Sequence, residues 1–174
     1  MPLYFAYGAN MDAAAMRARC PRSRPLGPAR LARHRFALMA DGYATVVRDP
    51  NAHVHGVLYD LALSDAAPLD RYEEVGRGLY AKVMQPLLRA GGAPARALVY
   101  VGGAPPVAAP KLKPGYLESV IAGARAAALP AAYVDFLASL LSGGAKTRAR
   151  PRAIKWTPRA STNPSLPAEG EETP

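Results

Sequence analysis

Short apolar stretches, each bounded by turn-forming residues, recur through the first hundred positions of the chain. Runs of this length, rich in aliphatic and aromatic residues, are typical of strands. Asp41-Gly42 and Ala90-Gly91-Gly92 are turn signals between neighbouring runs. Residues 21–30, rich in proline and arginine, are predicted as a loop. On this pattern we expect strands at residues 3–7, 35–40, 44–48, 54–61, 79–88 and 96–101, with Gly56 marking a bulge or a close approach.

Helix-forming composition is found in four other segments. The first consists of strong helix formers and stops before Pro21. The second can be capped by Ser64 and contains Pro68 only near its start, where proline is tolerated. We expect helices at residues 11–19, from 64 to about 76, and at roughly 115–127 and 131–141.

The order of these elements predicts a mixed α/β (α+β) domain, because strands with hairpin-length connections alternate irregularly with inserted helices. We expect a small curved sheet or β-barrel rather than a doubly wound fold. The 174 residues suffice for one ordinary domain. We place it at residues 1–144 and expect residues 145–174 to form a basic, then acidic, proline-rich tail that is partly disordered.

Composition narrows the class of protein further. Half of the residues are apolar and 20% are charged, which excludes a wholly disordered chain. No apolar run approaches the roughly 20 residues of a membrane helix, so no membrane partner is expected. The first residues lack the features of a secretory signal. Cys20 is the one cysteine, which excludes an internal disulfide and fits a reducing compartment, so we expect a cytoplasmic protein.

The formal net charge of +9 is concentrated in two segments. Residues 146–159 hold six basic side chains and no acid, and residues 17–35 hold seven arginines. Such clusters attract phosphate groups without specificity. Because no nucleic-acid motif accompanies them, we favour a solvated extension. A nucleic-acid partner bound through the basic tail is kept as an alternative that we do not expect.

Gly8-Ala9-Asn10 stands between a predicted strand and a predicted helix. Backbone N–H groups at a helix N-terminus have no intrahelical partner and favour negative charge, and glycine lets a substrate approach the backbone. This junction can therefore hold a carboxylate or the oxyanion of an acyl transfer. The simpler alternative is a turn at Gly8 with Asn10 as a helix cap.

The acidic stretch Leu69-Asp70-Arg71-Tyr72-Glu73-Glu74 ends the second predicted helix. Its carboxylates lie near the negative end of the helix dipole, and Asp70 is three and four positions from Glu73 and Glu74. Both effects, and burial, raise the pKa of a glutamate and suit it to act as a base. The alternative is a solvated acidic face.

The three histidines, His34, His53 and His55, show no metal-ligand spacing with nearby acids. Neither a Ser/His/Asp arrangement nor a phosphate-binding glycine loop is present in the sequence. We therefore interpret the histidines as structural and set those classes of site aside.

Four short motifs lie in order within residues 3–141: Tyr4-Phe5-Ala6-Tyr7-Gly8-Ala9-Asn10-Met11, Gly56-Val57-Leu58-Tyr59, Leu69 to Tyr80, and Pro114-Gly115-Tyr116. Together they resemble the γ-glutamylcyclotransferase family. The first is similar to the family's N-terminal signature, usually Tyr-Gly-Ser-Asn followed by Leu or Met. In the second signature a catalytic glutamate precedes a tyrosine by seven positions, as Glu73 precedes Tyr80. The two remaining likenesses are Gly56-Val57-Leu58-Tyr59 and Pro114-Gly115-Tyr116, the latter resembling a segment with a substrate-facing tyrosine.

Two positions depart from the family's pattern. Ala9 stands in place of the signature serine, so a hydroxyl contact is lost while the backbone N–H is kept. Glu74 stands where a glycine usually follows the catalytic glutamate, so Glu73 is assigned by spacing and Glu74 remains the alternative base. Asn10-Met11 is more similar to the general and γ-glutamylamine branches than to glutathione-specific relatives.

The resemblance implies a cofactor-free, metal-free enzyme that acts on a small γ-glutamyl molecule. The α-amine of the γ-glutamyl group attacks its own γ-carbonyl, and 5-oxoproline forms as an amine or amino acid leaves. Glu73 is implied as general acid and base, and the implied substrate-binding residues are Tyr7, Gly8, Ala9, Asn10, Met11, Tyr80 and Tyr116. Monomer and homodimer are both left open. A noncatalytic small-molecule-binding module of the same fold is the alternative outside enzymes.

Overall fold

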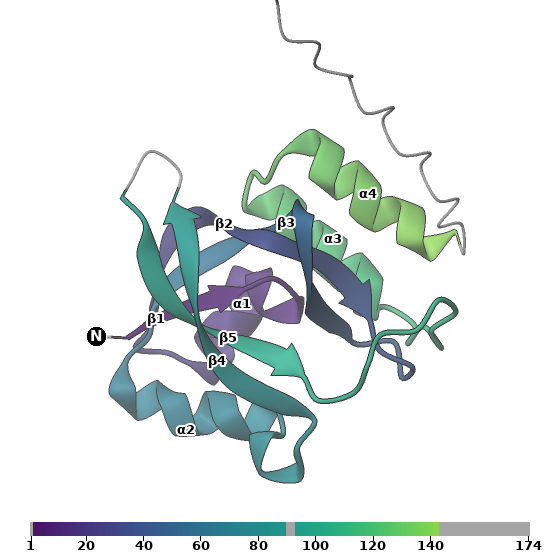
Figure 1. The fold of residues 1–174 in the computed structure, drawn as a ribbon. Helices are drawn as coiled ribbons and strands as arrows, with labels where there is room; N and C mark the ends of the chain where they lie inside the picture. Colours follow the sequence, from purple (N-terminus) through teal and green to yellow (C-terminus); the bar gives the residue numbers. More distant parts are fainter. Residues whose placement is uncertain (1, 90–92, 143–174) are drawn as a thin grey trace, which may run out of the picture.

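A closed β-barrel forms the centre of the molecule in the computed structural model, which describes residues 2–89 and 93–142 (Figure 1). The described strands are β1 (Leu3–Ala6), β2 (Arg24–Leu38), β3 (Ala44–Asp60), β4 (Tyr80–Arg89) and β5 (Ala95–Gly102). Their order around the barrel is β1-β3-β2-β4-β5, and only the closing pair, β1 and β5, runs parallel. The predicted mixed α/β fold with a small barrel is confirmed.

Helices cover the barrel from opposite sides. The described helices are α1 (Ala13–Arg19), α2 (Leu63–Tyr72), α3 (Tyr116–Ala126) and α4 (Ala131–Leu141), with short 3₁₀ turns η1 (Ala9–Met11) and η2 (Val75–Arg77). In Figure 1, α2 lies below the barrel, whereas α3 and α4 lie above it. Within residues 2–89 and 93–142, no helix combines the length and the apolar character needed to cross a membrane.

The hairpin of β2 and β3 is the longest pairing in the described sheet and wraps around the barrel. Its register shifts between Pro25 and Gly27 in β2, as at a β-bulge, which bends a strand and increases its twist. The prediction of a loop at residues 21–30 is therefore wrong from Arg24 onward, because the bulge accommodates a proline-rich stretch within the sheet. The strands predicted at 44–48 and 54–61 are likewise one strand, β3.

β1 is largely buried and pairs with β3 along all four of its residues. Phe5 is fully buried, and Ala6 pairs with Val57 of β3. A Cβ atom at Gly56 would lie 2.2 Å from the carbonyl oxygen of Ala6 and 2.8 Å from the Phe5 ring. The close approach predicted at Gly56 is thus confirmed, and it packs β3 directly onto the strand that leads into the loop at residues 8–11.

The start of α1 corrects one sequence-based expectation. Its N-cap is Asp12, whose Oδ1 accepts hydrogen bonds from the N–H groups of Ala14 and Ala15 at 2.8 and 3.3 Å. The helix therefore begins at Ala13 instead of residue 11. Asn10 does not cap it, and its side chain is free to act elsewhere.

α2 also differs from prediction at both ends. Its N-cap is Ala62 rather than Ser64, and the helix ends at Tyr72, before Gly76. The two C-terminal helices predicted at 115–127 and 131–141 are confirmed as α3 and α4. The turn predicted at 90–92 and the tail predicted at 145–174 lie outside the described residues.

Candidate active site

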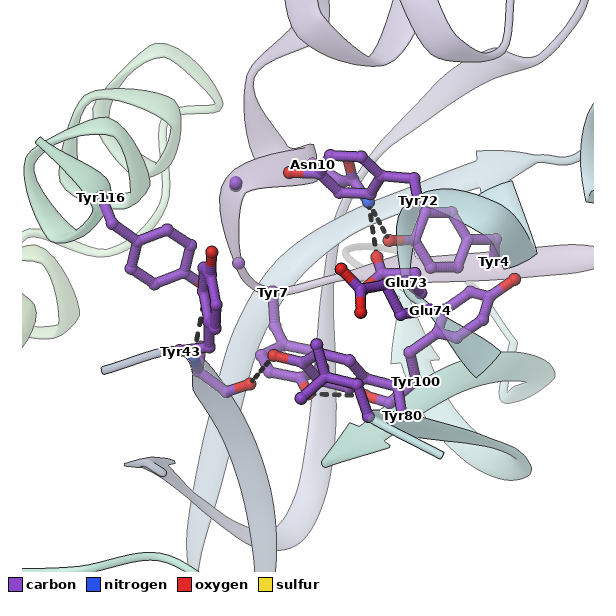
Figure 2. Close-up of a pocket in the computed structure, with 14 residues that line it drawn as sticks. Tyr4, Tyr7, Asn10, Tyr43, Tyr72, Glu73, Glu74, Tyr80, Tyr100 and Tyr116 are labelled. Carbon is purple, nitrogen blue, oxygen red and sulfur yellow. Dashed lines mark hydrogen bonds between the residues drawn. The ribbon is translucent and has the colours of Figure 1, made fainter. Parts of the chain in front are cut away.

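A cavity of about 280 Å³ opens where the loop after β1 meets the end of α2. Its lining combines two neighbouring carboxylates, three loop residues and an unusual number of tyrosines (Figure 2). The lining residues are Tyr4, Tyr7, Gly8, Ala9, Asn10, Tyr43, Ala44, Tyr72, Glu73, Glu74, Leu79, Tyr80, Tyr100 and Tyr116. The fold thus brings together segments from residue 4 to residue 116 around one carboxylate-containing cavity.

Glu73 follows the last residue of α2 and turns its carboxylate toward the loop. Its Oε1 accepts a hydrogen bond from Nδ2 of Asn10 at 2.8 Å, as Figure 2 shows. Burial raises the pKa of Glu73 to about 7, against the opposing effects of the Arg19 charge and the Asn10 hydrogen bond. A carboxyl group with a pKa near neutrality can both accept and return a proton at physiological pH.

Asp70 does not act on Glu73 as the sequence spacing suggested. Its carboxylate accepts hydrogen bonds from Lys82 Nζ at 2.8 Å and from Tyr100 Oη at 2.7 Å. Although burial opposes it, these bonds lower the pKa of Asp70. Of the causes expected from the sequence, burial is therefore the one that dominates the raised pKa of Glu73.

Glu74 lines the cavity but is tied toward the outside of the molecule. Its Oε2 accepts a hydrogen bond from Arg77 Nη1 at 2.8 Å, and 41% of its side chain is exposed. Its backbone has φ 50° and ψ 40°, in the left-handed region that glycine adopts without strain. This conformation gives a physical reason for the glycine that the resembling family usually has at this position.

The loop at residues 8–11 lines the cavity through three of its four residues. Gly8, Ala9 and Asn10 line the cavity, and within the described part of the chain the N–H groups of Ala9 and Asn10 have no hydrogen-bond acceptor. Met11, also expected to bind substrate, does not line this cavity: it is buried, and its N–H donates to the Gly8 carbonyl at 3.0 Å. The loop thus offers two N–H donors beside Glu73.

Three predicted or implied tyrosines surround the site, but their hydroxyl groups differ in what they can still donate. Tyr7 Oη donates to the carbonyl of Tyr100 at 2.5 Å, and Tyr80 Oη donates to the carbonyl of Ala44 at 2.6 Å. Tyr116 Oη instead accepts the N–H of Ala44 at 3.1 Å, which leaves its own proton for a ligand. Among these three, Tyr116 is therefore the one with a hydroxyl donor toward the cavity.

Gly8 permits this placement of Tyr116. A Cβ atom at residue 8 would lie 3.1 Å from Tyr116 Oη, closer than side chains normally pack. The glycine is therefore explained by the approach of a tyrosine from α3. This contact joins the loop at residues 8–11 to Tyr116 at the start of α3.

Sequence reasoning missed four cavity tyrosines: Tyr4, Tyr43, Tyr72 and Tyr100. One signal was present, because the chain has nine tyrosines and only three phenylalanines. A buried tyrosine needs a partner for its hydroxyl, so such an excess favours a polar-lined cavity over a plain apolar core. The positions themselves depend on which strands become neighbours.

The histidines lie away from the cavity. His34 Nδ1 is 2.8 Å from the Ala32 carbonyl, and the rings of His53 and His55 meet edge to face at 4.9 Å between centroids. In the described ranges, no group of three histidine, cysteine, aspartate or glutamate residues is arranged to hold a metal ion.

Comparison with known proteins identifies the family of this chain. The family model described as "Gamma-glutamyl cyclotransferase, AIG2-like" matches residues 4–118, which include the loop, Glu73 and Tyr116. The chain belongs to this family. No curated protein sequence matches at the significance required.

Solved structures of γ-glutamyl cyclotransferases share the fold. One named "Gamma-glutamyl cyclotransferase" is 25% identical, with a TM-score of 0.70 over 79% of this chain and 86% of its own. A human protein described as uncharacterized is 26% identical, with the same TM-score and the same coverage of both chains. A yeast γ-glutamyl cyclotransferase described as specific to glutathione, 13% identical, shows the same fold, with a TM-score of 0.57 over 82% of this chain and 94% of its own.

Proposed function

We propose that this protein converts a γ-glutamyl amino acid or a γ-glutamylamine into 5-oxoproline and the free amine. The single observation that supports this most is the buried carboxylate of Glu73, with a pKa of about 7, beside the loop at residues 8–10. Membership of the γ-glutamyl cyclotransferase family supports the same chemistry.

The reaction needs a nucleophile that the substrate itself supplies. The α-ammonium group of the γ-glutamyl moiety loses a proton to the Glu73 carboxylate, and the resulting amine attacks the γ-carbonyl carbon. A C–N bond closes a five-membered ring, and the carbonyl oxygen becomes an oxyanion. When the ring carbonyl re-forms, the original C–N bond breaks and Glu73 returns its proton to the leaving nitrogen. The ring nitrogen still carries two protons, and it gives one to the regenerated Glu73 carboxylate, which passes it to the departing amine, so that the amine leaves as its ammonium form and protons and electrons balance.

The loop and Tyr116 complete the machinery in this proposal. Ala9 and Asn10 line the cavity, and their N–H groups have no acceptor within the described residues, so in this proposal these groups donate to the oxyanion or to the substrate α-carboxylate. Tyr116 can donate its free hydroxyl proton to one of the same oxygens. Tyr7 and Tyr80, whose protons are engaged by backbone carbonyls, shape the cavity through their rings. Holding amine and carbonyl together supplies the proximity that the reaction lacks in solution.

The two departures from the family's pattern are compatible with catalysis. Ala9 lacks a hydroxyl group but retains the backbone N–H that the proposal uses. Glu74 adds a carboxylate, which is paired with Arg77 at 2.8 Å. Neither substitution removes a group that the reaction requires, so a noncatalytic binding module is the less supported alternative.

The test is release of 5-oxoproline from γ-glutamyl-alanine and from ε-(γ-glutamyl)-lysine, measured by chromatography with purified protein. We expect release from at least one, and the faster substrate identifies the preferred leaving group. α-Glutamyl-alanine is the matched control, because its α-amine cannot close a five-membered ring on the amide carbonyl. No release from either γ-glutamyl compound by folded protein contradicts the proposal, and binding without release favours the noncatalytic module.

A further inference from the structure

A series of hydrogen-bonded side chains from three different elements ends at Glu73. Arg19, the last residue of α1, donates from Nη1 to Asn10 Oδ1 at 2.6 Å. Asn10, in η1, donates from Nδ2 to Glu73 Oε1 at 2.8 Å and to Tyr4 Oη at 3.0 Å. Figure 2 shows the last part of this chain, with Asn10 between Tyr4 and Glu73.

The chemistry of Arg19 determines which way the Asn10 amide points. An asparagine side chain has an acceptor end and a donor end, and a guanidinium group can only donate. Arg19 therefore requires the Asn10 oxygen, and the NH₂ group must face Glu73 and Tyr4. Reversing the amide would place Nδ2 of Asn10 against the Arg19 guanidinium, where both groups donate, and Oδ1 against the Glu73 carboxylate, where both accept. Asn10 is only 3% exposed, so water could not compensate for that reversal.

Arg19 is itself held against the segment that carries Glu73. Its guanidinium carbon lies 3.7 Å from the centroid of the Tyr72 ring, and Tyr72 directly precedes Glu73. A planar guanidinium can stack on an aromatic ring and donate from its edge at the same time, whereas the ammonium of lysine cannot do both in one fixed geometry. One side chain thus joins α1, the loop and the end of α2.

We propose that Arg19 is a positioning residue for the active site, which orients the Asn10 amide and thereby fixes the Glu73 carboxylate as the acceptor that faces the cavity. The consequence for turnover rests on the proposed function. Arg19 does not line the cavity, so it acts through Asn10 and Tyr72 rather than on the substrate.

The surroundings of Glu73 make this role measurable. The other titratable groups that line the cavity with it are Glu74 and seven tyrosines: Tyr4 and Tyr7 (β1 and its end), Tyr43 (before β3), Tyr72 (α2), Tyr80 (β4), Tyr100 (β5) and Tyr116 (α3). Burial raises the pKa of Tyr4, Tyr7, Tyr72, Tyr80, Tyr100 and Tyr116, so these six remain neutral at physiological pH. Burial raises the pKa of Glu73, and the Arg19 charge opposes that rise. Removing Arg19 should therefore raise the pKa of Glu73 further.

The experiment compares Arg19→Met with Arg17→Met in the full chain. Arg17 is on the same helix and exposed, so its substitution removes the same charge without touching Asn10. The Glu73 carboxyl is titrated by ¹³C NMR, with its resonance assigned by its loss in Glu73→Gln. We expect the pKa of Glu73 to rise by about one pH unit in Arg19→Met, the lower end of the usual effect of an adjacent opposite charge. Arg17→Met should leave it close to the wild-type value.

The rate of 5-oxoproline release against pH gives the second measurement. We expect the loss of kcat in Arg19→Met to be about tenfold greater at pH 6 than at pH 9, with KM unchanged, because one pKa unit changes the carboxylate fraction about tenfold below both pKa values. A several-fold loss should remain at pH 9, because the Asn10 amide is no longer held. In Arg19→Met, a merely structural role would lower kcat by the same factor at every pH. Such a pH-independent fall in Arg19→Met, or the same Glu73 pKa in Arg19→Met and Arg17→Met, overturns the proposal.

Arg19→Lys keeps the test decisive if Arg19→Met does not fold. The lysine retains the charge but loses the fixed fork, so we expect a Glu73 pKa near the wild-type value with a kcat that stays several-fold lower even at pH 9. A lysine variant identical to wild type in both measurements overturns the positioning role. If wild-type protein releases no 5-oxoproline, the proposed function fails, and the NMR titration still decides whether Arg19 acts on Glu73.

Discussion

The inner and outer sides of the α2 C-terminus place neighbouring carboxylates in opposite environments. Glu73 turns inward, is buried, and accepts a hydrogen bond from an asparagine amide. Glu74 turns outward and pairs with Arg77, with 41% of its side chain exposed. The comparison teaches that composition alone does not make a base. Burial raises the pKa of Glu73 to about 7, whereas Glu74 forms an ion pair with Arg77 at the surface.

The largest expected effect separates the two glutamates directly. Glu73→Gln keeps the size of the side chain and can still accept from Asn10, but it cannot take the ammonium proton. We expect 5-oxoproline formation to fall at least about 10²-fold, the usual scale of a general base. Glu74→Gln should lose far less. An inactive Glu74→Gln beside an active Glu73→Gln would move the base by one residue, and full activity in both would place it elsewhere.

Replacing Glu73 should lower activity but raise the stability of the folded protein, and this second effect should depend on pH. In an unfolded chain Glu73 ionises near its usual pKa of 4.5, but in the folded protein only near 7. Folded wild type therefore loses stability as pH rises between these values, by about 3 kcal/mol in total. Glu73→Gln cannot ionise, so it should be more stable than wild type at pH 8, with the difference shrinking toward pH 5. Urea unfolding at both pH values measures this, and Glu74→Gln, which keeps Glu73, should lose stability over the same pH range as wild type.

Ala9→Pro tests whether the inner carboxylate works with the loop backbone. Ala9 is the first residue of η1, where proline fits without breaking an internal hydrogen bond, so the variant should fold. It lacks one N–H donor, and we expect kcat to fall about 20-fold, as for a lost hydrogen bond to a charged group. Ala9→Ser, which keeps the N–H, should stay near the wild-type rate. Equal rates for wild type and Ala9→Pro would exclude this role of the Ala9 amide.

The pH dependence of wild-type kcat should give the smallest effect. With a pKa of about 7, Glu73 is mostly protonated at pH 6 and mostly ionised at pH 8. Because the carboxylate is the base, kcat should rise about tenfold between these values. The profile of Glu74→Gln should superimpose on that of wild type after scaling. A profile that is flat from pH 6 to pH 8 would mean that Glu73 does not limit turnover as a base.

Much of the fold was predictable because its signals are local. Apolar runs bounded by turns mark most strands, and the segments of α3 and α4 contain strong helix formers. The first part of β2 was missed because Pro25 and Pro28 are ordinarily read as loop residues. Only pairing with β3, and a bulge between residues 25 and 27, makes that stretch a strand. The sequence-based alternative that named Asn10 as the helix cap was also wrong, because the structure uses Asp12. Either side chain can cap a helix, so the sequence does not decide between them.

By itself, the sequence determined the family resemblance, the presence of a glutamate seven residues before a tyrosine, and a glycine loop after the first strand. Only the tertiary structure decided that Glu73 is the buried carboxylate, that Met11 does not line the cavity, that four further tyrosines do, and that Arg19 reaches Glu73 through Asn10. The reason is physical. A motif specifies residue types at short range, but burial, amide orientation and pKa depend on groups that barrel closure brings together from distant positions in the chain.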